Sequence, residues 1–197
     1  MTFLIDLYMK LLYVAIFPLE INEKFECISE SSAFTESLAT RLFSTCTVDV
    51  LRVISFTILK RLSEINRSST TITKLQYENY HFFTCTSSSG TLVVITDITY
   101  PQEVVRRLLH VMVNDETLET KKYFDLYKDP KSDKLYKIKE DLEDCKVILL
   151  DNIEKVLHRG ETLDTIVEKT DQLSSNTKTF YRRAKRQNRW CPWFFTF

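Results

Sequence analysis

A stripe of sixteen regularly spaced positions near the C-terminal end constrains the fold of this chain more than any other feature. The positions lie alternately three and four residues apart, and their mean period of about 3.5 residues is that of a left-handed coiled coil. Eleven of them are apolar and five are polar. The set is Leu135, Ile138, Leu142, Cys145, Leu149, Asn152, Val156, Arg159, Leu163, Ile166, Thr170, Leu173, Thr177, Phe180, Ala184 and Gln187.

A continuous helix through these positions would need partner helices. It would be roughly 80 Å long at 1.5 Å per residue, and its apolar stripe is too narrow for burial in a compact domain. Arg159 lies at the centre of the stripe, and its guanidinium would cost several kcal/mol if buried without acceptors for its N–H groups. The sequence therefore predicts a multi-helix bundle in which partner helices supply those acceptors and Arg159 fixes the register.

The residues around Arg159 resemble the core motif of the R-SNAREs, the arginine-bearing vesicle fusion proteins. The resemblance is carried by residues 152–166 and 180–188 and is gapless across all sixteen positions. In that family the arginine forms the ionic central layer of a parallel four-helix bundle, facing a glutamine from each of three Q-SNARE helices (Qa, Qb and Qc). The resemblance makes Arg159 the ionic layer and implies these hydrophobic layers: Leu135, Ile138, Leu142, Cys145, Leu149, Val156, Leu163, Ile166, Leu173, Phe180 and Ala184.

Composition and motif searches argue against several other classes of protein. Lysine plus arginine and aspartate plus glutamate both number 27, so no overall basic field favours nucleic acid. The two glycines leave no phosphate-binding loop. The five cysteines form no CxxC pair, which favours reduced thiols over disulfides or zinc. His81, His110 and His158 show no metal-binding or catalytic spacing, so we expect no enzyme activity and no cofactor.

The apolar beginning of the chain reads as a strand or strand pair. Asp6 and Lys10 interrupt the stretch from Phe3 to Leu19, and the longest uninterrupted run, from Leu11 to Phe17, has seven residues. No basic segment precedes it, and about 20 residues are needed to span a bilayer. We therefore expect buried structure there and a cytosolic protein, rather than a signal peptide or an anchor.

Residues 1–114 show alternating strand and helix patterns. An apolar face of helical period runs from Val48 to Ile65, and strand patterns follow at residues 71–77, 80–86 and 91–97. The last two strands flank the turn sequence Ser-Ser-Ser-Gly and predict a hairpin. Pro101 then begins a helix whose apolar face is Val104, Val105, Leu108, Leu109 and Met112.

This order of elements resembles the longin domain that precedes the SNARE motif in one branch of the R-SNAREs. Residues 80–97, followed by Tyr100-Pro101, are most similar to the longin R-SNARE that lacks a transmembrane helix and is held on membranes by lipid groups. The resemblance implies an α+β fold, with a five-stranded, mainly antiparallel sheet sandwiched by helices and followed by a long coiled-coil helix.

Four segments follow from these patterns: a longin domain (1–114), a linker with a possible short helix (115–133), the R-SNARE motif (134–190) and an aromatic tail (191–197). We expect the helix to continue through Gly160. The motif also carries surplus apolar residues outside the stripe, and two interpretations stay open. They either widen the stripe for the four-helix bundle or fold back on the longin domain and hide the motif. These residues are Val147, Ile148, Leu150, Ile153 and Leu157.

The end of the motif combines cations with aromatic residues. Lipid-anchored relatives carry a prenylated cysteine fourth from the terminus, where this sequence has Phe194, so we expect no farnesylation by that route. The composition favours weak attachment to anionic cytosolic membrane surfaces, with Cys191 a candidate for acylation. A disordered tail and an alternative or truncated terminus are the competing interpretations. The membrane-proximal cations are Arg182, Arg183, Lys185, Arg186 and Arg189.

The sequence as a whole predicts a cytoplasmic R-SNARE, peripheral on Golgi, vesicle or endosomal membranes and engaged in transport such as that between the endoplasmic reticulum and the Golgi. Its motif would fold with three Q-SNARE helices, and that folding would pull two membranes together. The longin domain would regulate assembly or targeting. The alternative is a regulator that forms SNARE complexes without driving fusion, or a trafficking adaptor or tether whose coiled coil only scaffolds.

Overall fold

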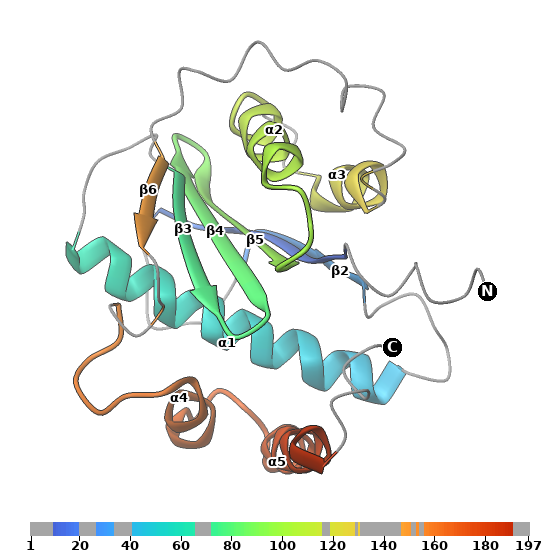
Figure 1. Cartoon of the computed structure of the whole chain (residues 1–197), viewed down its shortest axis with the longest axis vertical. Coiled ribbons are helices and arrows are strands. Elements are labelled where there is room, and N and C mark those ends of the chain that lie inside the picture. Colours follow the sequence, from blue (N-terminus) through green and yellow to red (C-terminus); the bar gives the residue numbers. More distant parts are fainter. Residues whose placement is uncertain are drawn as a thin grey trace.

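The computed structural model describes residues 10–19, 27–33, 41–65, 72–115, 119–128, 130, 147–150, 153 and 156–190. A twisted sheet lies between two layers of helices (Figure 1). The strands are β1 (Leu11–Phe17), β2 (Ser29–Ser32), β3 (Ile72–Tyr77), β4 (Tyr80–Ser87), β5 (Gly90–Asp97) and β6 (Val147–Leu150). The helices are α1 (Arg41–Ile65), α2 (Gln102–Val113), α3 (Thr120–Tyr127), α4 (Leu163–Lys169) and α5 (Ser175–Trp190).

The sheet has the strand order β2-β1-β5-β4-β3-β6, and its first five strands are antiparallel. The expected α+β architecture and five-stranded antiparallel sheet are confirmed. The hairpin between β4 and β5 is also present, and its turn brings Gly90 against β1. A Cβ at Gly90 would lie 2.6 Å from the carbonyl oxygen of Phe17, so this close approach requires glycine.

Helices α2 and α3 cover one face of the sheet (Figure 1). All five residues of the apolar face predicted for α2 are buried, against Leu11, Phe83 and Val94 from the strands. Helix α3 lies where a short linker helix was expected, but Tyr123, Phe124 and Tyr127 are buried in the same cluster. It is therefore part of the core.

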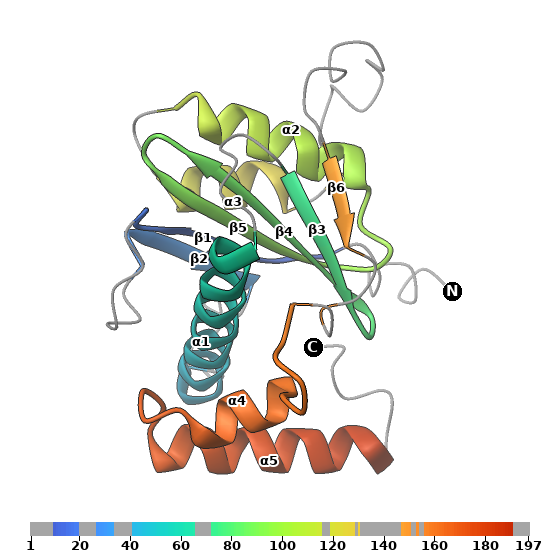
Figure 2. The ribbon, with the colours of Figure 1, turned by 90° about the vertical axis from the view of Figure 1, so that its left-hand side faces the viewer.

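Helix α1 covers the opposite face of the sheet, and α4 and α5 pack against it from outside (Figure 2). A salt bridge fixes α1 to the edge of the sheet. Arg52 Nε donates to Glu30 Oε2 at 3.0 Å, and the Tyr13 hydroxyl donates to the same oxygen at 2.7 Å. Burial and the Arg52 guanidinium act in opposite directions on Glu30, and its pKa is held below the usual range.

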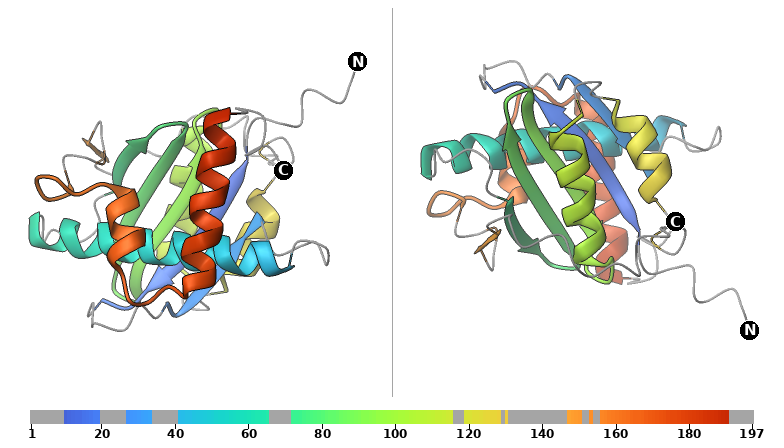
Figure 3. Two further views of the ribbon diagram at one scale, coloured as in Figure 1. Left: turned by 90° about the horizontal axis from the view of Figure 1, so that it is seen from below. Right: turned by 90° about the horizontal axis from the view of Figure 1, so that it is seen from above.

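The motif does not form one uninterrupted helix in the chain on its own, and the continuous helix expected with partner helices stays a prediction. The described part of the motif consists of a strand, a turn and two helices that cross over α1 (Figure 3). A lone helix would leave its apolar stripe in water, whereas this path buries the stripe residues Val156, Leu163 and Leu173 in one cluster with residues of α1 and the sheet.

Candidate functional site

The first described part of the motif forms an edge strand. Strand β6 runs parallel to β3, with Val147 opposite Ile72 and Leu150 opposite Leu75. Its sequence, Val-Ile-Leu-Leu, includes β-branched residues that favour strands, and the pairing satisfies backbone groups on the β3 edge that would otherwise be free. Leu149, an expected layer residue, therefore lies in a strand here, together with three of the surplus apolar residues.

The next part of the motif joins the buried cluster that also contains residues of α1 and the sheet. Ile153 is fully buried, Val156 is 3% exposed, and Leu157 packs partly buried against the same cluster. The Val156 N–H donates to the Ile153 carbonyl at 2.9 Å, which turns the chain at this point. Of the two interpretations of the surplus apolar residues, contact with the longin domain is the one found in this structure.

Arg159 lies on the surface, in the turn between β6 and α4. Its side chain is exposed and forms no hydrogen bond or ion pair with another described residue. Gly160 follows with φ +84°, in the left-handed region that glycine adopts without strain. The expected continuity of the helix through Gly160 is therefore incorrect for this form, because the backbone reverses there.

A salt bridge joins this turn to α1. Arg61 Nη2 donates to Glu161 Oε1 at 3.0 Å, and Glu161 Oε2 accepts the His158 backbone N–H at 3.0 Å. Burial opposes ionisation of Glu161, but the His158 N–H and the Arg61 guanidinium together keep its pKa low. The turn that carries Arg159 is thus tethered to the longin domain by a neighbouring carboxylate.

Helix α4 begins at a reciprocal cap. Thr162 Oγ1 accepts the Thr165 backbone N–H at 3.2 Å, and Thr165 Oγ1 accepts the Thr162 N–H at 2.8 Å, so two orphan donors of the first turn are satisfied. One face of the helix buries Leu163 and Val167 beside α1, and Ile166 packs at the border of the cluster. A local cap therefore stabilises a helix that starts after Gly160 rather than before it.

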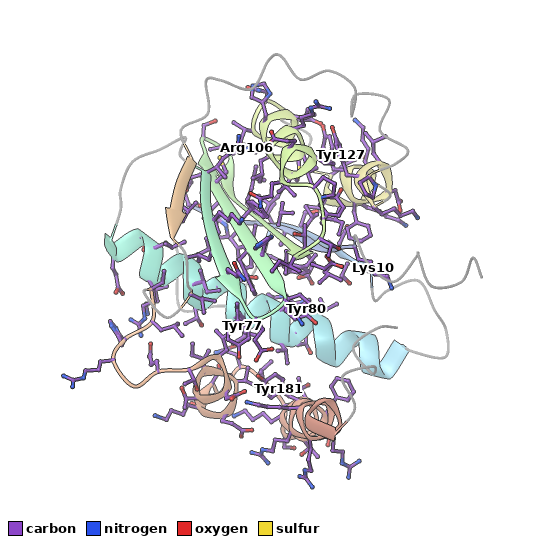
Figure 4. All side chains as sticks on the ribbon, viewed as in Figure 1. Lys10, Tyr77, Tyr80, Arg106, Tyr127 and Tyr181 are labelled. Atoms are coloured by element: carbon purple, nitrogen blue, oxygen red, sulfur yellow. The ribbon has the colours of Figure 1, made fainter. Side chains whose placement is uncertain are left out.

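The buried face continues through Leu173, just before α5, to Thr177 in the helix, and these residues are 6% and 3% exposed. Ser174 Oγ accepts the Thr177 N–H at 3.1 Å at the start of the helix. Tyr181 lies below the end of the β3–β4 hairpin, where Figure 4 labels Tyr77 and Tyr80. Burial raises the pKa of Tyr181 to about 12, with smaller contributions from Tyr77 and nearby carboxylates.

The structure brings some expected layer residues together and separates others. Val156, Leu163 and Leu173 share one buried cluster, Leu149 lies in β6, Arg159 is on the surface and Phe180 is half-buried. Arg182, Arg183, Lys185 and Arg186 are exposed on α5, which also includes Ala184 and Arg189. Leu135, Ile138, Leu142, Cys145 and Cys191 lie outside the described residues.

Sequence reasoning missed four residues of this arrangement. Val167 follows Leu163 by four residues, and that helical spacing was available as a signal for a second buried position. Tyr181 lies beside the stripe and was not recognised. Arg61 and Glu161 are 100 residues apart, so no local pattern could have paired them.

No helix in the described parts of the chain is both long and apolar enough to cross a membrane. This finding concerns α1 to α5 as the structure defines them.

Comparisons with known proteins point to one family. The Synaptobrevin family model matches residues 134–193. "Synaptobrevin homolog YKT6" of Debaryomyces hansenii is 33% identical over 137 residues, which cover 57% of this chain and 68% of that protein. The Schizosaccharomyces pombe homologue of the same description is 32% identical over 137 residues, covering 59% and 69%. "VAMP-like protein YKT62" of Arabidopsis thaliana is 47% identical over 68 residues, 34% of each chain.

Proposed function

The chain belongs to the synaptobrevin family of R-SNAREs, and from this premise we propose that its motif supplies one helix of a parallel four-helix bundle with Qa-, Qb- and Qc-SNARE helices. Membership makes it a vesicle-trafficking SNARE, a class that acts by assembly and not by catalysis. The observation that carries the proposal is the gapless set of sixteen positions with Arg159 at its centre.

Arg159 would form the ionic layer of that bundle. In the structure of the chain alone its guanidinium faces solvent, where water satisfies its donors at little cost. Inside a bundle it would lose that water, so acceptors from the three partner helices would have to replace it. This requirement explains why an arginine is tolerated in a mostly apolar seam, and it restricts the register to the one in which those acceptors meet it.

The longin domain would hold the motif in a closed form until partners arrive. Val156, Leu163 and Leu173 are buried on the longin domain, and the same side chains would fill layers of the bundle. One side chain cannot occupy both places, so the two arrangements exclude each other. Assembly then requires that β6, α4 and α5 leave α1 and β3 and refold as one helix.

The cost of that release is moderate. Fully burying an aliphatic side chain contributes about 1.5–3 kcal/mol, and the described motif buries Ile153, Val156, Leu163, Val167 and Leu173. A bundle that buries the same side chains together with further layers regains this contribution, so partner helices can replace the longin domain as the surface that covers them.

The basic face of α5 would attach the protein peripherally to anionic cytosolic membranes. Arg182, Arg183, Lys185 and Arg186 are exposed, and each cation near such a surface contributes about 1 kcal/mol. Attachment of this kind is weakened by salt. It would place the C-terminal end of the motif, where zippering finishes, beside the membrane.

Assembly with purified partners tests the proposal. The full chain is mixed with candidate sets of Qa, Qb and Qc helices, and complexes are identified by size-exclusion chromatography and thermal melting. We expect a stoichiometric four-helix complex, which Arg159→Ala destabilises by about 1–3 kcal/mol or shifts in register. Lys169→Ala removes the same charge from an exposed position outside the layers and should have little effect.

Two results would contradict this proposal. If no Q-SNARE set assembles with the chain, the motif is a scaffold of another kind. If complexes form but Arg159→Ala and Lys169→Ala melt alike, Arg159 is not the ionic layer. A complex that forms normally yet supports no mixing of vesicle lipids would favour a regulatory SNARE that does not drive fusion.

A further inference from the structure

Helices α4 and α5 are joined by a ladder of polar contacts, which we call the clasp. Its carboxylates are Asp164 and Glu168 of α4, and its donors are Tyr181, Arg182 and Lys185 of α5. The Tyr181 hydroxyl donates to Asp164 Oδ1 at 2.7 Å, and Arg182 Nε donates to Glu168 Oε1 at 2.6 Å. Arg182 Nη2 also contacts Glu168, and Lys185 Nζ contacts Asp164.

Every side chain of the clasp lies outside the sixteen layer positions. Its partners are 14 to 21 residues apart in the chain. In one continuous helix these separations would correspond to roughly 20–30 Å at 1.5 Å per residue. The clasp can therefore exist only while α4 and α5 are folded back on each other, and changing it leaves the layers of a bundle intact.

Helix α5 also carries cations that take no part in the contacts of the clasp. Arg183 and Arg186 are exposed and form no ion pair with another described residue. On a helix, positions 182 and 186 are one turn apart and 183 lies three residues before 186, so these side chains form one strip. The strip continues into the clasp, because Arg182 is 55% and Lys185 is 47% exposed.

We propose that an anionic lipid surface opens the clasp, so that arrival at a membrane releases the motif from its closed form. Arg183 and Arg186 make the first contact. Lipid phosphates then compete with Asp164 and Glu168 for Lys185 and Arg182, while the surface repels those two carboxylates. The proposal deepens the function proposed above, since it rests on a closed form that assembly must open.

A lipid surface fits this strip better than a soluble anion does. One small anion can neutralise one or two cations, whereas a membrane presents many phosphates at once to a strip of four. The two carboxylates would also be close to any surface that α5 touches, because they bond to the same helix. Only an extended negative surface would both compete for the cations of α5 and repel the two carboxylates of α4.

Amide hydrogen exchange on the full chain tests the proposal without any SNARE partner. The protein is incubated with phosphatidylserine-rich vesicles, with phosphatidylcholine vesicles, or with soluble glycerophosphoserine at the same headgroup concentration. We expect anionic vesicles to speed exchange in β6 and α4 at least several-fold, with α2 and β5 unchanged as internal controls. The neutral vesicles and the soluble headgroup should have no such effect.

Two double variants and a matched double control show which residues carry the effect. Arg183→Gln/Arg186→Gln changes exposed side chains outside the clasp, so it should keep slow exchange but lose the response to vesicles. Asp164→Asn/Glu168→Gln removes the acceptors, so it should exchange fast in β6 and α4 before any vesicle is added. Glu119→Gln/Asp171→Asn removes the same charge from exposed positions outside the clasp and should behave like the wild type.

The proposal is overturned if anionic vesicles bind the protein without speeding exchange in β6 and α4, or do not bind it. An equal response to phosphatidylcholine or to glycerophosphoserine would also overturn it, because neither offers a negative surface. A negative result in this experiment would not bear on the proposed assembly with Q-SNARE helices, because no SNARE partner is present. Conversely, a chain that assembles with no Q-SNARE set could still show the vesicle response.

Discussion

The longin domain and the SNARE motif use their apolar residues in different ways. In the longin domain, strands β1, β4 and β5 are buried on both faces, and residues such as Val94 and Leu108 have one set of neighbours within this fold. The motif packs one face on α1 and the edge of β3, and its outer side is charged. The first region is the core of one fold, whereas in the function proposed above the second is a covering that partner helices would replace.

The difference is also visible in what the polar residues do. Within the longin domain, Glu30 and Arg52 tie β2 to α1 and are part of a single fold. Within the motif, Glu161, Asp164 and Glu168 stabilise the folded-back arrangement but occupy no layer of the proposed bundle. Apolar layer residues would thus serve both forms, while the charged residues between them distinguish one form from the other.

The largest expected effect on the free energy of unfolding comes from the core of the longin domain and distinguishes it from the packing of the motif. Leu108→Ala, in the fully buried face of α2, should lower the free energy of unfolding by about 2–5 kcal/mol. Leu163→Ala, in α4, should lower it much less and instead speed exchange within the motif, because a covering can open without global unfolding. Urea denaturation and hydrogen exchange measure the two effects. Leu126→Ala changes a side chain of α3 that is 58% exposed, and it is the control. If Leu108→Ala and Leu163→Ala lowered the free energy of unfolding equally, the longin domain and the motif would unfold as one cooperative unit.

The second expected effect concerns the release of the motif. Without residues 1–128 the segment 134–190 should be largely unfolded in water, because an isolated helix lacks tertiary packing, and circular dichroism measures this directly. It should assemble with Q-SNARE helices about 10–100-fold faster than the full chain if closure is worth about 1.4–2.8 kcal/mol. Residues 1–128 added back as a separate chain should slow it again. Equal rates with and without them would leave the longin domain a targeting role.

Periodicity was sufficient to predict several elements of the longin domain, and the resemblance to the family supplied the fold that joins them. The alternating strands, the Ser-Ser-Ser-Gly hairpin and the five-residue face of α2 each have a local signal, and the structure contains all of them. Helix α3 was predicted as an element but not as part of the core, because its aromatic residues sit in a polar stretch between Asp115 and Asp133.

The path of the motif could not be predicted from local patterns. A seven-residue repeat indicates which side chains a helix would bury in a bundle, but it does not indicate how the same side chains pack when partner helices are absent. The surplus apolar residues were the clue, and fold-back was one of the two interpretations they left open. The choice depended on long-range contacts such as Arg61 with Glu161 and β3 with β6, which have no signature in the sequence.

A smaller effect should come from a buried histidine in the longin domain. His81 is 3% exposed on β4, and its Nδ1 has no hydrogen-bond partner among the described residues. Burial and nearby Lys74 lower its pKa, although Asp97 acts in the opposite direction. The folded state therefore disfavours the proton that the unfolded chain accepts near pH 6.5, so stability should fall as the pH drops below about 6.5.

Urea denaturation between pH 7.5 and pH 5 measures this dependence. His81→Phe should flatten the profile, because it removes the proton-binding group while keeping an aromatic ring beside Phe83. His110→Gln, at an exposed position on α2, should leave the profile as in the wild type. A profile that is unchanged by His81→Phe would assign the pH dependence to another group.

The smallest expected effect tests the tether between the two regions. The pKa of Glu161 is lowered in the folded chain, so its contribution is present above the unfolded value of about 4.3 and is lost as the pH falls through the lower, folded pKa. Glu161→Gln should weaken the contact by less than about 1 kcal/mol, because the pair with Arg61 is partly exposed and screened by solvent.

Exchange of amides 156–167, corrected for intrinsic rates, should rise below pH 4.3 in the wild type and lose this pH response in the Glu161→Gln variant. Glu119→Gln, exposed at the start of α3, should leave the response intact. If Glu161→Gln and Glu119→Gln behaved alike, the turn that carries Arg159 would be held by its apolar neighbours Ile153 and Val156 alone, and the charged residues would distinguish the two forms only through the α4–α5 clasp.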